Sequence, residues 1–380
     1  MAAQMLPSGS SETVSPAPHR VADIRPLDRA DLPEATALFE LVMGSGVRRS
    51  RPAMLGFFER TLFDNPWADP QLPSLVAIDE RERIVGFIGA EVRRLRFGER
   101  PVRVVWSSHF VVDPAARHLA PGAFLLRRML EGAQDATVTD NGSDVVRQMW
   151  VGLGGQVLHL KGIHWVRLFQ PWRVAARVAA GRAGRRPRAT LLRLAGALDA
   201  ATGAATARYL EPAPADDTPT RLTPHGLLDA MPTVSKRLTL YPDYDEGFLE
   251  WLFEELGKVE RRGRLVANLV HAESGRALGW YLYYLRPGAR CEVLQVAASE
   301  RDVGRVLDHL LSHAHANGSA AVRGRLEPNL VEAVVRRRCL LWHRGGALIH
   351  SRDPQLLLAM QSEKALVTRL EGECWGDALI

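Results

Sequence analysis

Two side chains that could move a proton lie on neighbouring segments with strand-like composition. Glu91 falls within residues 83–97 and His109 within residues 102–112, and both segments are rich in β-forming residues. A carboxylate or an imidazole in such a place is a candidate general base for an amine or a hydroxyl. Strand alternation turns His109 to the face opposite its two neighbours. We therefore take Glu91 and His109 as candidate catalytic residues, with a hydrogen-bonded structural role as the alternative for each.

The segment that follows, residues 110–126, has the order of a strand, a tight loop and the start of a helix. Asp113-Pro114 ends the strand, and Gly122 precedes an apolar run at helical spacing. A loop in that place presents backbone N–H groups and the positive end of a helix dipole to an anion such as a phosphate. The alternative is that Pro121 and Gly122 form only a strand-to-helix turn.

This segment resembles the acetyl-CoA loop of the GNAT (GCN5-related N-acetyltransferase) acyltransferases, whose pattern is V-x-P-x-x-R-G-x-G-x-G-x-x-L. The pattern aligns without a gap, and the matching residues are Val112, Pro114, Arg117, Gly122 and Leu125. His118 and Ala120 stand at glycine positions of the family, where a Cβ restricts positive φ. Pro121, between them and Gly122, has no N–H to donate.

The resemblance implies a site for acetyl-CoA or another acyl-CoA, used as a co-substrate, with no metal. The main chain of Val111 and Val112 would hold the pantetheine arm and polarise the thioester. The residues facing the diphosphate would be Arg117, His118, Leu119, Ala120, Pro121, Gly122 and Ala123. The family's usual acid is a tyrosine, and Trp150 stands at its position here; an indole N–H is a donor only and cannot protonate a thiolate as a phenol does.

The order of expected elements repeats in the two halves of the chain, as in a tandem GNAT-like protein. We expect an α/β (α+β) fold with two GNAT-like domains, each a mixed, mostly antiparallel twisted sheet flanked by helices. The expected limits are a disordered tail at 1–20, domains at 21–170 and 236–380, and a basic connector at 171–235. The phosphate loop of the second half is weaker, because Ala298 replaces the proline and Asp302 would repel a phosphate.

Composition places the chain among ordinary globular proteins of two-domain size. It has 380 residues, 46% hydrophobic and 24% charged, and a formal net charge of +6. The cysteines, Cys291, Cys339 and Cys374, show no metal or redox spacing and indicate a reducing compartment. No apolar run reaches 18 residues, so we expect a cytoplasmic protein, with peripheral attachment to the inner face of the membrane as an extension of that interpretation.

Much of the positive charge is concentrated between Pro171 and Leu210, where eight arginines accompany one acid, Asp199. Leucines at helical spacing indicate that part of this segment is a basic amphipathic helix. A solvated connector is the simplest interpretation, and docking on an anionic membrane surface or a protein partner is the alternative. Nucleic acid is disfavoured because aromatic residues are almost absent from the segment.

Three further groups of residues have a functional and a structural interpretation. His309, His313 and His315 could bind a metal or line a polar helix face. Asn141 and Asp144 have the character of turn and helix-cap residues. An aromatic group on one expected strand favours core packing, with an acceptor platform as the alternative; it consists of Trp280, Tyr281, Tyr283 and Tyr284.

The resemblance therefore predicts an acyltransferase that moves an acetyl or other acyl group from acyl-CoA to an amine or hydroxyl of a small-molecule or sugar acceptor, by direct transfer. The layout and the segments LQVAA and VTRLEGECW are similar to tandem GNAT-like proteins associated with bacterial exopolysaccharide and cellulose synthesis. One alternative is a non-catalytic scaffold or acyl-CoA sensor in polysaccharide assembly. A second is an aminoacyl-tRNA-dependent transferase.

Overall fold

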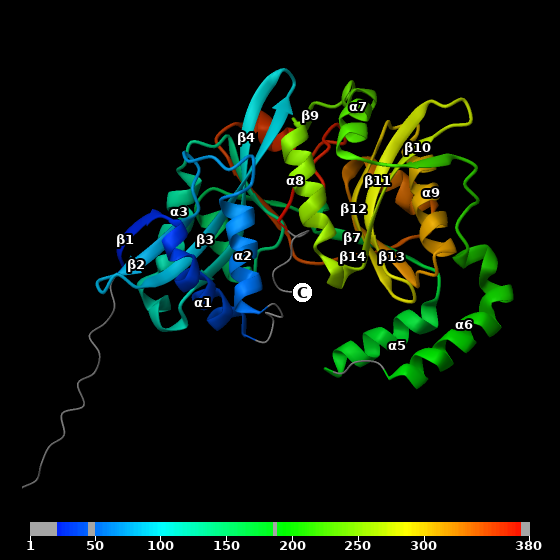
Figure 1. Ribbon diagram of the computed structural model, residues 1–380, viewed down its shortest axis with the longest axis horizontal. Helices are drawn as coiled ribbons and strands as arrows, with labels where there is room; N and C mark the ends of the chain where they lie inside the picture. The colour runs from blue at the N-terminus through cyan, green and yellow to red at the C-terminus, as the bar shows by residue number, and fades with distance from the viewer. Residues whose placement is uncertain (1–20, 45–49, 185–187, 374–380) are drawn as a thin grey trace, which may run out of the picture.

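Two β-sheets lie side by side in the computed structural model, which describes residues 21–44, 50–184 and 188–373 (Figure 1). The first sheet has the order β1-β2-β3-β4-β5-β15-β6, with β9 pairing β3; the second has the order β14-β7-β13-β12-β11-β10-β8. The strands of the first sheet are β1 (Val21–Pro26), β2 (Leu75–Asp79), β3 (Ile84–Phe97), β4 (Arg100–Val112), β5 (Ala136–Thr139), β6 (Gln156–Leu158), β9 (Leu240–Pro242) and β15 (Ala347–Ser351). Those of the second are β7 (Ile163–Leu168), β8 (Thr218–Arg221), β10 (Arg264–His271), β11 (Ala277–Leu285), β12 (Arg290–Ala298), β13 (Ala321–Arg325) and β14 (Leu340–His343).

Helices cover both faces of each sheet. The α-helices are α1 (Leu32–Met43), α2 (Arg51–Leu62), α3 (Pro121–Leu130), α4 (Asp144–Gly152), α5 (Pro171–Arg182), α6 (Ala189–Leu210), α7 (Pro224–Ser235), α8 (Glu246–Gly257), α9 (Val303–Ala316), α10 (Val331–Arg336) and α11 (Pro354–Ala359). Short 3₁₀ helices occupy Arg29–Asp31, Pro114–Leu119, Leu160–Gly162, Glu260–Arg262 and Pro328–Leu330. On the first sheet, α1 and α2 pack on one face and α3 and α4 on the other; on the second, α9 and α10 oppose α7 and α8.

The two sheets exchange strands. β7 pairs with β13 and β14 of the second sheet, although it precedes residue 170, and β15 pairs with β5 and β6 of the first sheet, although it follows residue 236. The sheets thus do not divide at the expected domain limits, 21–170 and 236–380. Alternating hydrophobicity indicates that a segment is a strand with a buried face, but it does not indicate which sheet supplies the partner.

Side-chain contacts join the N-terminal half of the chain to helix α8 of the C-terminal half. Trp67 stacks on Phe248 of α8, with ring centroids 3.6 Å apart, and its indole Nε1 donates to Asp245 over 2.6 Å. Arg60 of α2 donates to the buried carboxylate of Glu255 in α8 over 2.8 Å. These contacts bury apolar and charged groups from both halves against each other, so the halves share a packed interface.

The basic segment forms two helices, α5 and α6, that project beside the second sheet (Figure 1). Asp199 accepts hydrogen bonds from the backbone of Trp172 and Arg173, which fixes α6 against the start of α5. The rest of the expected connector is part of the second domain: β8 pairs with β10, and α7 packs in the core. Three leucines of α6 are exposed; they are Leu191, Leu194 and Leu198.

The remaining sequence candidates have structural partners. Tyr281 and Tyr283 of β11 bond the Nδ1 atoms of His309 and His313, over 3.0 and 2.7 Å. The side chains of Trp280 and Tyr284, on the other face of the strand, are fully buried. No group of three metal-ligating side chains occurs within the described residues. The expected tail, 1–20, and Cys374 lie outside those residues.

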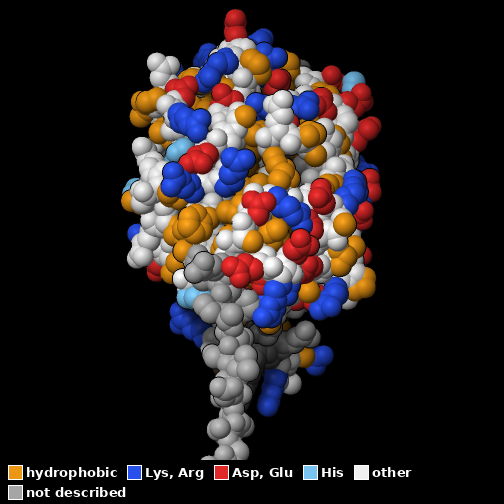
Figure 2. Space-filling model, turned by 90° about the vertical axis from the view of Figure 1, so that its left-hand side faces the viewer, with side chains coloured by type: hydrophobic (Ala, Val, Ile, Leu, Met, Phe, Trp, Pro, Cys, Tyr) orange, Lys and Arg blue, Asp and Glu red, His pale blue; other side chains and the backbone are white. Residues whose placement is uncertain are grey.

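Charge is mixed on the face of the molecule formed by the first sheet and its helices, where basic and acidic side chains alternate over the surface (Figure 2). In the part of the chain that the structure covers, no helix has the length and apolar character needed to span a bilayer.

Candidate functional site

The first sheet opens between β4 and β5. These strands pair in parallel only where Val104, Val105 and Trp106 face residues 136–138. β4 continues to Val112, whereas β5 ends at Thr139, so the edge of β4 from Ser107 onward has no pairing with β5. Backbone N–H and C=O groups on such an edge can pair with an extended ligand as they would with another strand.

A bulge distorts β4 at this opening. The pairing with β3 shifts by one residue between Phe87 and Gly89, and His109 adopts a φ of 55°. The extra residue turns the His109 ring toward α1 and α2, where its centroid lies 4.9 Å from the ring of Phe58. Its Nδ1 lies 2.8 Å from the Ser108 Oγ. His109 therefore belongs to an aromatic cluster on one face of the sheet.

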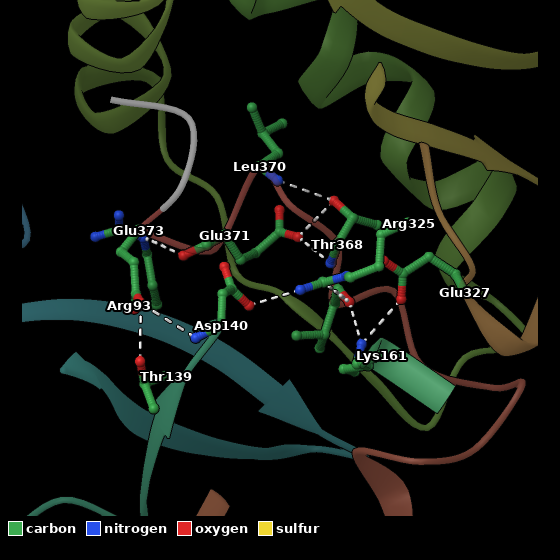
Figure 3. A network of polar contacts seen from close by, with 11 residues as sticks. Arg93, Thr139, Asp140, Lys161, Arg325, Glu327, Thr368, Leu370, Glu371 and Glu373 are labelled. Carbon is green, nitrogen blue, oxygen red and sulfur yellow. Dashed lines mark hydrogen bonds and ion pairs between the residues drawn. The ribbon is translucent and has the colours of Figure 1, made fainter. Parts of the chain in front are cut away.

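Glu91 is buried on β3 and forms an ion pair with Arg93 over 2.8 Å. Burial raises the pKa of Glu91, and the Arg93 charge opposes that rise. The Arg93 guanidinium also donates to the carbonyl oxygen of Glu371, over 2.9 Å, and so ties β3 to the C-terminal segment (Figure 3). Glu91 also forms a side-chain hydrogen bond with Ser108, whose Oγ lies 2.8 Å from the His109 Nδ1, so the structure links the two candidates through Ser108 in a buried network.

The loop expected to cradle a phosphate is a 3₁₀ helix, Pro114–Leu119, whose i→i+3 hydrogen bonds use its own N–H groups. Ala120 takes the left-handed conformation, with φ 54° and ψ 35°, and accepts a hydrogen bond from the N–H of Ala123 over 3.0 Å. Pro121 has no N–H. Gly122 is the second residue of α3, so its N–H lies in the first turn of the helix. The start of α3 therefore offers an anion this first-turn N–H, with Arg117 and His118 exposed beside it.

Gly122 also has a packing role. A Cβ at this position would lie 3.2 Å from Val112 Cγ2 and 3.3 Å from Phe110 Cζ. These distances are short for carbon contacts, so the glycine lets α3 approach β4 closely. The turn interpretation of this glycine and the binding interpretation are compatible, because the same close approach brings the Gly122 N–H near the open edge of β4.

Trp150, at the position of the family tyrosine, is fully buried in the core between α4 and the first sheet. Its Nε1 is one of the buried polar atoms without a hydrogen-bond partner among the described residues. The carbonyl oxygen of Trp150 accepts a hydrogen bond from Gly155 over 2.7 Å, at the end of its helix. Its side chain therefore fills space in the core and supplies no acid.

A pair of carboxyl groups lies where β5 ends (Figure 3). Glu373 Oε1 accepts from Thr139 Oγ1 over 2.8 Å and from the N–H of Asp140 over 3.2 Å. Asp140 Oδ1 accepts from Arg325 over 2.6 Å. Asp140 Oδ2 and Glu373 Oε2 are buried and have no partner in the part of the chain that the structure describes.

Burial, together with the charges of Asp140 and Glu91, raises the pKa of Glu373 well above its ordinary value. A carboxyl group whose pKa moves toward neutrality can exchange a proton at physiological pH, which suits a general acid or base. Glu373 and Asp140 are thus the titratable pair nearest the open end of β5.

Sequence reasoning did not select this pair. Asp140 and Glu373 are 233 positions apart, and each stands in a short polar segment that reads as a turn. The neighbouring candidate Asp144 is the first residue of α4 and pairs with Arg147, while Ser143 is the N-cap of that helix. Asn141 lines a cavity beside the end of β5. Gly372, next to Glu373, packs against Asp140: a Cβ there would lie 1.7 Å from Asp140 Oδ2, so a larger residue would displace that carboxylate.

A cavity of about 650 Å³ lies between the end of β5 and the second sheet. Ten of its seventeen lining residues are basic and two, Asp140 and Glu292, are acidic. The basic residues that are buried are Lys161, Arg262, Arg323, Arg325 and Arg369, and those that are less buried are Arg177, Arg261, Arg286, Arg290 and Arg344.

Ion pairs hold the buried wall of this cavity. Glu292 accepts from Arg323 over 2.6 Å and from Arg369 over 3.1 Å, and these cations lower the pKa of Glu292 to about 2. Glu327 accepts from Lys161 over 2.9 Å and from Arg325 over 2.7 Å (Figure 3). Four of the five buried cations, Lys161, Arg323, Arg325 and Arg369, are therefore matched by carboxylates.

The loop at the corresponding place of the second half is closed by side chains. Asp302 accepts two hydrogen bonds from Arg276, over 2.8 and 3.0 Å, at the start of α9. Arg337 donates to the carbonyl oxygen of Gly304 over 2.6 Å. The carboxylate and these arginine contacts occupy the loop, in agreement with the poor match of its sequence to the phosphate-loop pattern.

Comparison with known proteins gives a result for the fold. No protein-family model matches the chain, and no curated protein matches its sequence. A probable N-acyltransferase of Enterococcus faecalis matches with a TM-score of 0.56 at 9% identity, over 87% of this chain and 72% of that chain. A GCN5-related N-acetyltransferase of Anabaena variabilis matches with a TM-score of 0.56 at 8% identity, over 87% and 73%. The chain has a GNAT fold.

N-myristoyltransferase of Saccharomyces cerevisiae, solved with bound myristoyl-CoA, is also similar, with a TM-score of 0.51 at 11% identity over 92% of this chain and 84% of that chain. At these identities the likeness concerns the fold alone. It confirms the expected α/β class with two GNAT-like sheets flanked by helices. Within the GNAT fold, Val111 and Val112 end β4 beside the opening, and residues 117–123 follow at the start of α3.

Proposed function

We propose that this protein is an acyltransferase that moves an acyl group from acyl-CoA to an amine or hydroxyl of a small-molecule acceptor. The observation that carries the proposal is the opening between β4 and β5, which leaves the β4 edge unpaired from Ser107 onward, next to the start of α3. An unpaired strand edge beside a helix N-terminus suits a ligand with an amide-bearing arm and a diphosphate. The GNAT fold supports the same class of reaction.

The residues of this chain fit acyl-CoA in part. The edge of β4 up to Val112 would hold the pantetheine arm through main-chain hydrogen bonds. The Gly122 N–H, with the exposed Arg117 and His118 near it, would bind the diphosphate. The bound thioester would supply the acyl group and the thiol leaving group. Because the 3₁₀ helix consumes N–H groups of the loop, we expect binding to rely more on β4 than on the loop.

Proton transfer is assigned to the carboxyl pair at the end of β5. A new bond forms between the acceptor nitrogen or oxygen and the acyl carbon, and the carbon–sulfur bond breaks. The proton lost by the acceptor goes to Glu373 Oε2, which is buried and lacks a partner within the described chain. The thiolate takes its proton from water, since Trp150 is buried in the core and an indole is not an acid.

Calorimetry of the full chain with acetyl-CoA and with myristoyl-CoA tests binding, and release of free thiol in the presence of amines and amino sugars tests transfer. In Glu373→Gln we expect turnover to fall by about 100-fold, the lower range for loss of a general base, with acyl-CoA affinity unchanged. Glu363→Gln, at an exposed site, is the matched control and should keep full turnover. Absence of binding by both thioesters would contradict the proposal.

A second candidate is a non-catalytic acyl-CoA sensor or scaffold, including one in exopolysaccharide assembly. Two observations favour it: Trp150 replaces the family tyrosine and is buried, and the phosphate loop is a 3₁₀ helix. The experiments above separate the two candidates. Tight acyl-CoA binding without thiol release in the presence of any amine or amino sugar would favour the sensor.

A further inference from the structure

The lining of the cavity between the sheets has many more basic than acidic residues. Its lining has ten basic and two acidic residues, an excess of eight positive charges. By contrast, basic and acidic side chains are interspersed on the face shown in Figure 2. Guanidinium groups gathered in one hollow repel each other unless anions lie among them.

The buried cations and the outer cations differ in their pairing. Arg323, Arg325 and Arg369 are held by carboxylates, as described above. Arg286 and Arg344, by contrast, have no side-chain hydrogen bond or ion pair within the described residues, and Arg177 donates only to the carbonyl oxygen of Gly288 there. These three guanidinium groups therefore keep donors for a ligand.

The concentration of positive charge in the cavity also shifts the pKa values of groups in its lining. Burial and the charges of four arginines lower the pKa of His164, in the cavity lining, to about 3. Burial and the charge of Arg290 lower the pKa of Arg323 to about 10, against the pull of Glu292. The Nδ1 of His164 is buried without a hydrogen-bond partner among the described residues. The field in the cavity thus favours an anion.

Size and chemistry narrow the class of ligand. A volume of about 650 Å³ suits a small organic molecule, for which sites of about 300–1,000 Å³ are usual. Arginine presents a planar fork of donors that matches two oxygens of a phosphate, and clusters of arginine are typical of phosphate sites. The guanidinium groups of Arg177, Arg286 and Arg344 have no carboxylate partner within the described residues, and three such charges exceed what a single carboxylate would offset and suit a diphosphate.

The cavity also adjoins the carboxyl pair. Asp140 lines it and is bonded to Arg325 through Oδ1, while Oδ2 is one of the unpartnered oxygens at the end of β5. A ligand bound by Arg286 and Arg344 would therefore reach toward the open end of the first sheet. We propose that this cavity binds the phosphate or diphosphate group of a small organic ligand, and, resting on the function proposed above, that this ligand is the acyl acceptor.

The test is calorimetry of the full chain with pyrophosphate, inorganic phosphate and succinate. We expect pyrophosphate to bind at least tenfold more tightly than succinate. In the double variant Arg286→Ala, Arg344→Ala we expect pyrophosphate affinity to fall at least tenfold. In the double variant Arg286→Lys, Arg344→Lys we expect a smaller fall, because lysine keeps the positive charge but lacks the planar pair of donors of a guanidinium group. Both residues are exposed, and thermal unfolding of each variant should match that of the parent.

Arg336→Ala is the matched control, because Arg336 is exposed on α10, pairs with Glu332 and does not line the cavity. Absence of pyrophosphate binding by the parent, equal affinity for succinate, or an equal loss in Arg336→Ala would each overturn the proposal. Binding of phosphatidylglycerol vesicles through Arg286 and Arg344, without binding of pyrophosphate, would also overturn it. Pyrophosphate binding without acyl-CoA binding would contradict the acyltransferase function and leave the anion site standing.

Discussion

At the residue scale, burial and a neighbouring carboxylate, Asp140, change the proton affinity of Glu373. Each carboxyl keeps one oxygen without a partner among the described residues, and the two groups lie close enough to raise the pKa of Glu373. Of these two carboxyl groups, Asp140 is the one that Arg325 bonds. The folded state therefore binds a proton at Glu373 more tightly than the unfolded chain does, which links stability to pH.

The first prediction follows from that linkage. Because the pKa of Glu373 is raised in the folded state, its contribution to stability is complete below about pH 4.3, the unfolded value, and is lost as pH rises through the folded pKa. Glu373→Gln removes this loss, and its amide oxygen can still accept from Thr139. We expect the variant to be more stable than the parent at pH 8 by about 1–3 kcal/mol.

Urea unfolding of both proteins from pH 5 to pH 8 measures this difference, with Glu363→Gln as the surface control. A gap between Glu373→Gln and the parent that shrinks with rising pH would contradict the assignment.

The second prediction concerns Trp150, whose side chain is completely buried and whose indole N–H has no partner among the described residues. Trp150→Ala should lower the free energy of unfolding by about 3–5 kcal/mol through the cavity it leaves. Trp150→Phe should cost less than half of that, since it keeps an aromatic ring and breaks no hydrogen bond. Chemical denaturation gives both values. Equal costs would contradict the packing role given to the ring.

At the scale of elements, β4 and α3 are the parts that define the site. β4 supplies the bulge and the unpaired edge, and α3 begins against its end. The sequence pattern there led to the expectation of a cradle with several free N–H groups. The 3₁₀ helix of residues 114–119 takes up those groups instead. Ala120, which follows it, adopts the left-handed conformation although it is not a glycine, so its Cβ did not prevent the positive φ.

The third prediction tests the close packing of these elements. Gly122→Ala places a Cβ 3.2 Å from Val112 and 3.3 Å from Phe110, so α3 must shift; we expect a loss of stability of about 1–3 kcal/mol. The control is Gly152→Ala, in α4, where a Cβ meets nothing within 4 Å and should stabilise the protein by up to about 1 kcal/mol. Thermal unfolding compares the two. A Gly122→Ala protein as stable as Gly152→Ala would refute the close packing.

For the whole molecule, the exchange of β7 and β15 is the dominant feature. β15 fills the first sheet between β5 and β6 with the fully buried Leu348 and Ile349, and β7 does the same in the second sheet with Trp165. Removing either strand opens a hydrophobic core and leaves the edges of two neighbouring strands unpaired.

The fourth prediction is that the halves do not fold alone. Residues 21–170 lack β15, so we expect no cooperative thermal transition from this fragment, whereas the full chain unfolds cooperatively. Fragments 1–235 and 236–380, expressed together, should copurify because each supplies a strand to the other. Circular dichroism during heating measures the first expectation and affinity copurification the second. A cooperative transition from 21–170 alone would contradict the role given to the exchanged strand.

The sequence by itself determined the elements and the fold class. Alternation at 83–97 and 102–112 predicted β3 and β4 to within a few residues. The likeness of residues 110–126 to a GNAT loop led to the fold that the structural comparisons confirm. These features are local, because the spacing of apolar residues reports directly which side of a helix or strand is buried.

Only the tertiary structure decided which strands share a sheet and which charges share a cavity. β15 joins β5, Glu373 joins Asp140, and Arg286 and Arg344 come to one hollow from distant segments. Such partners are determined by the packing of the whole chain, because the residues next to each of them in the sequence do not indicate which distant residue it will contact. The same physics explains why the expected loop was located correctly while its supply of free N–H groups was not: backbone hydrogen bonds are settled by the conformation that the surrounding core allows.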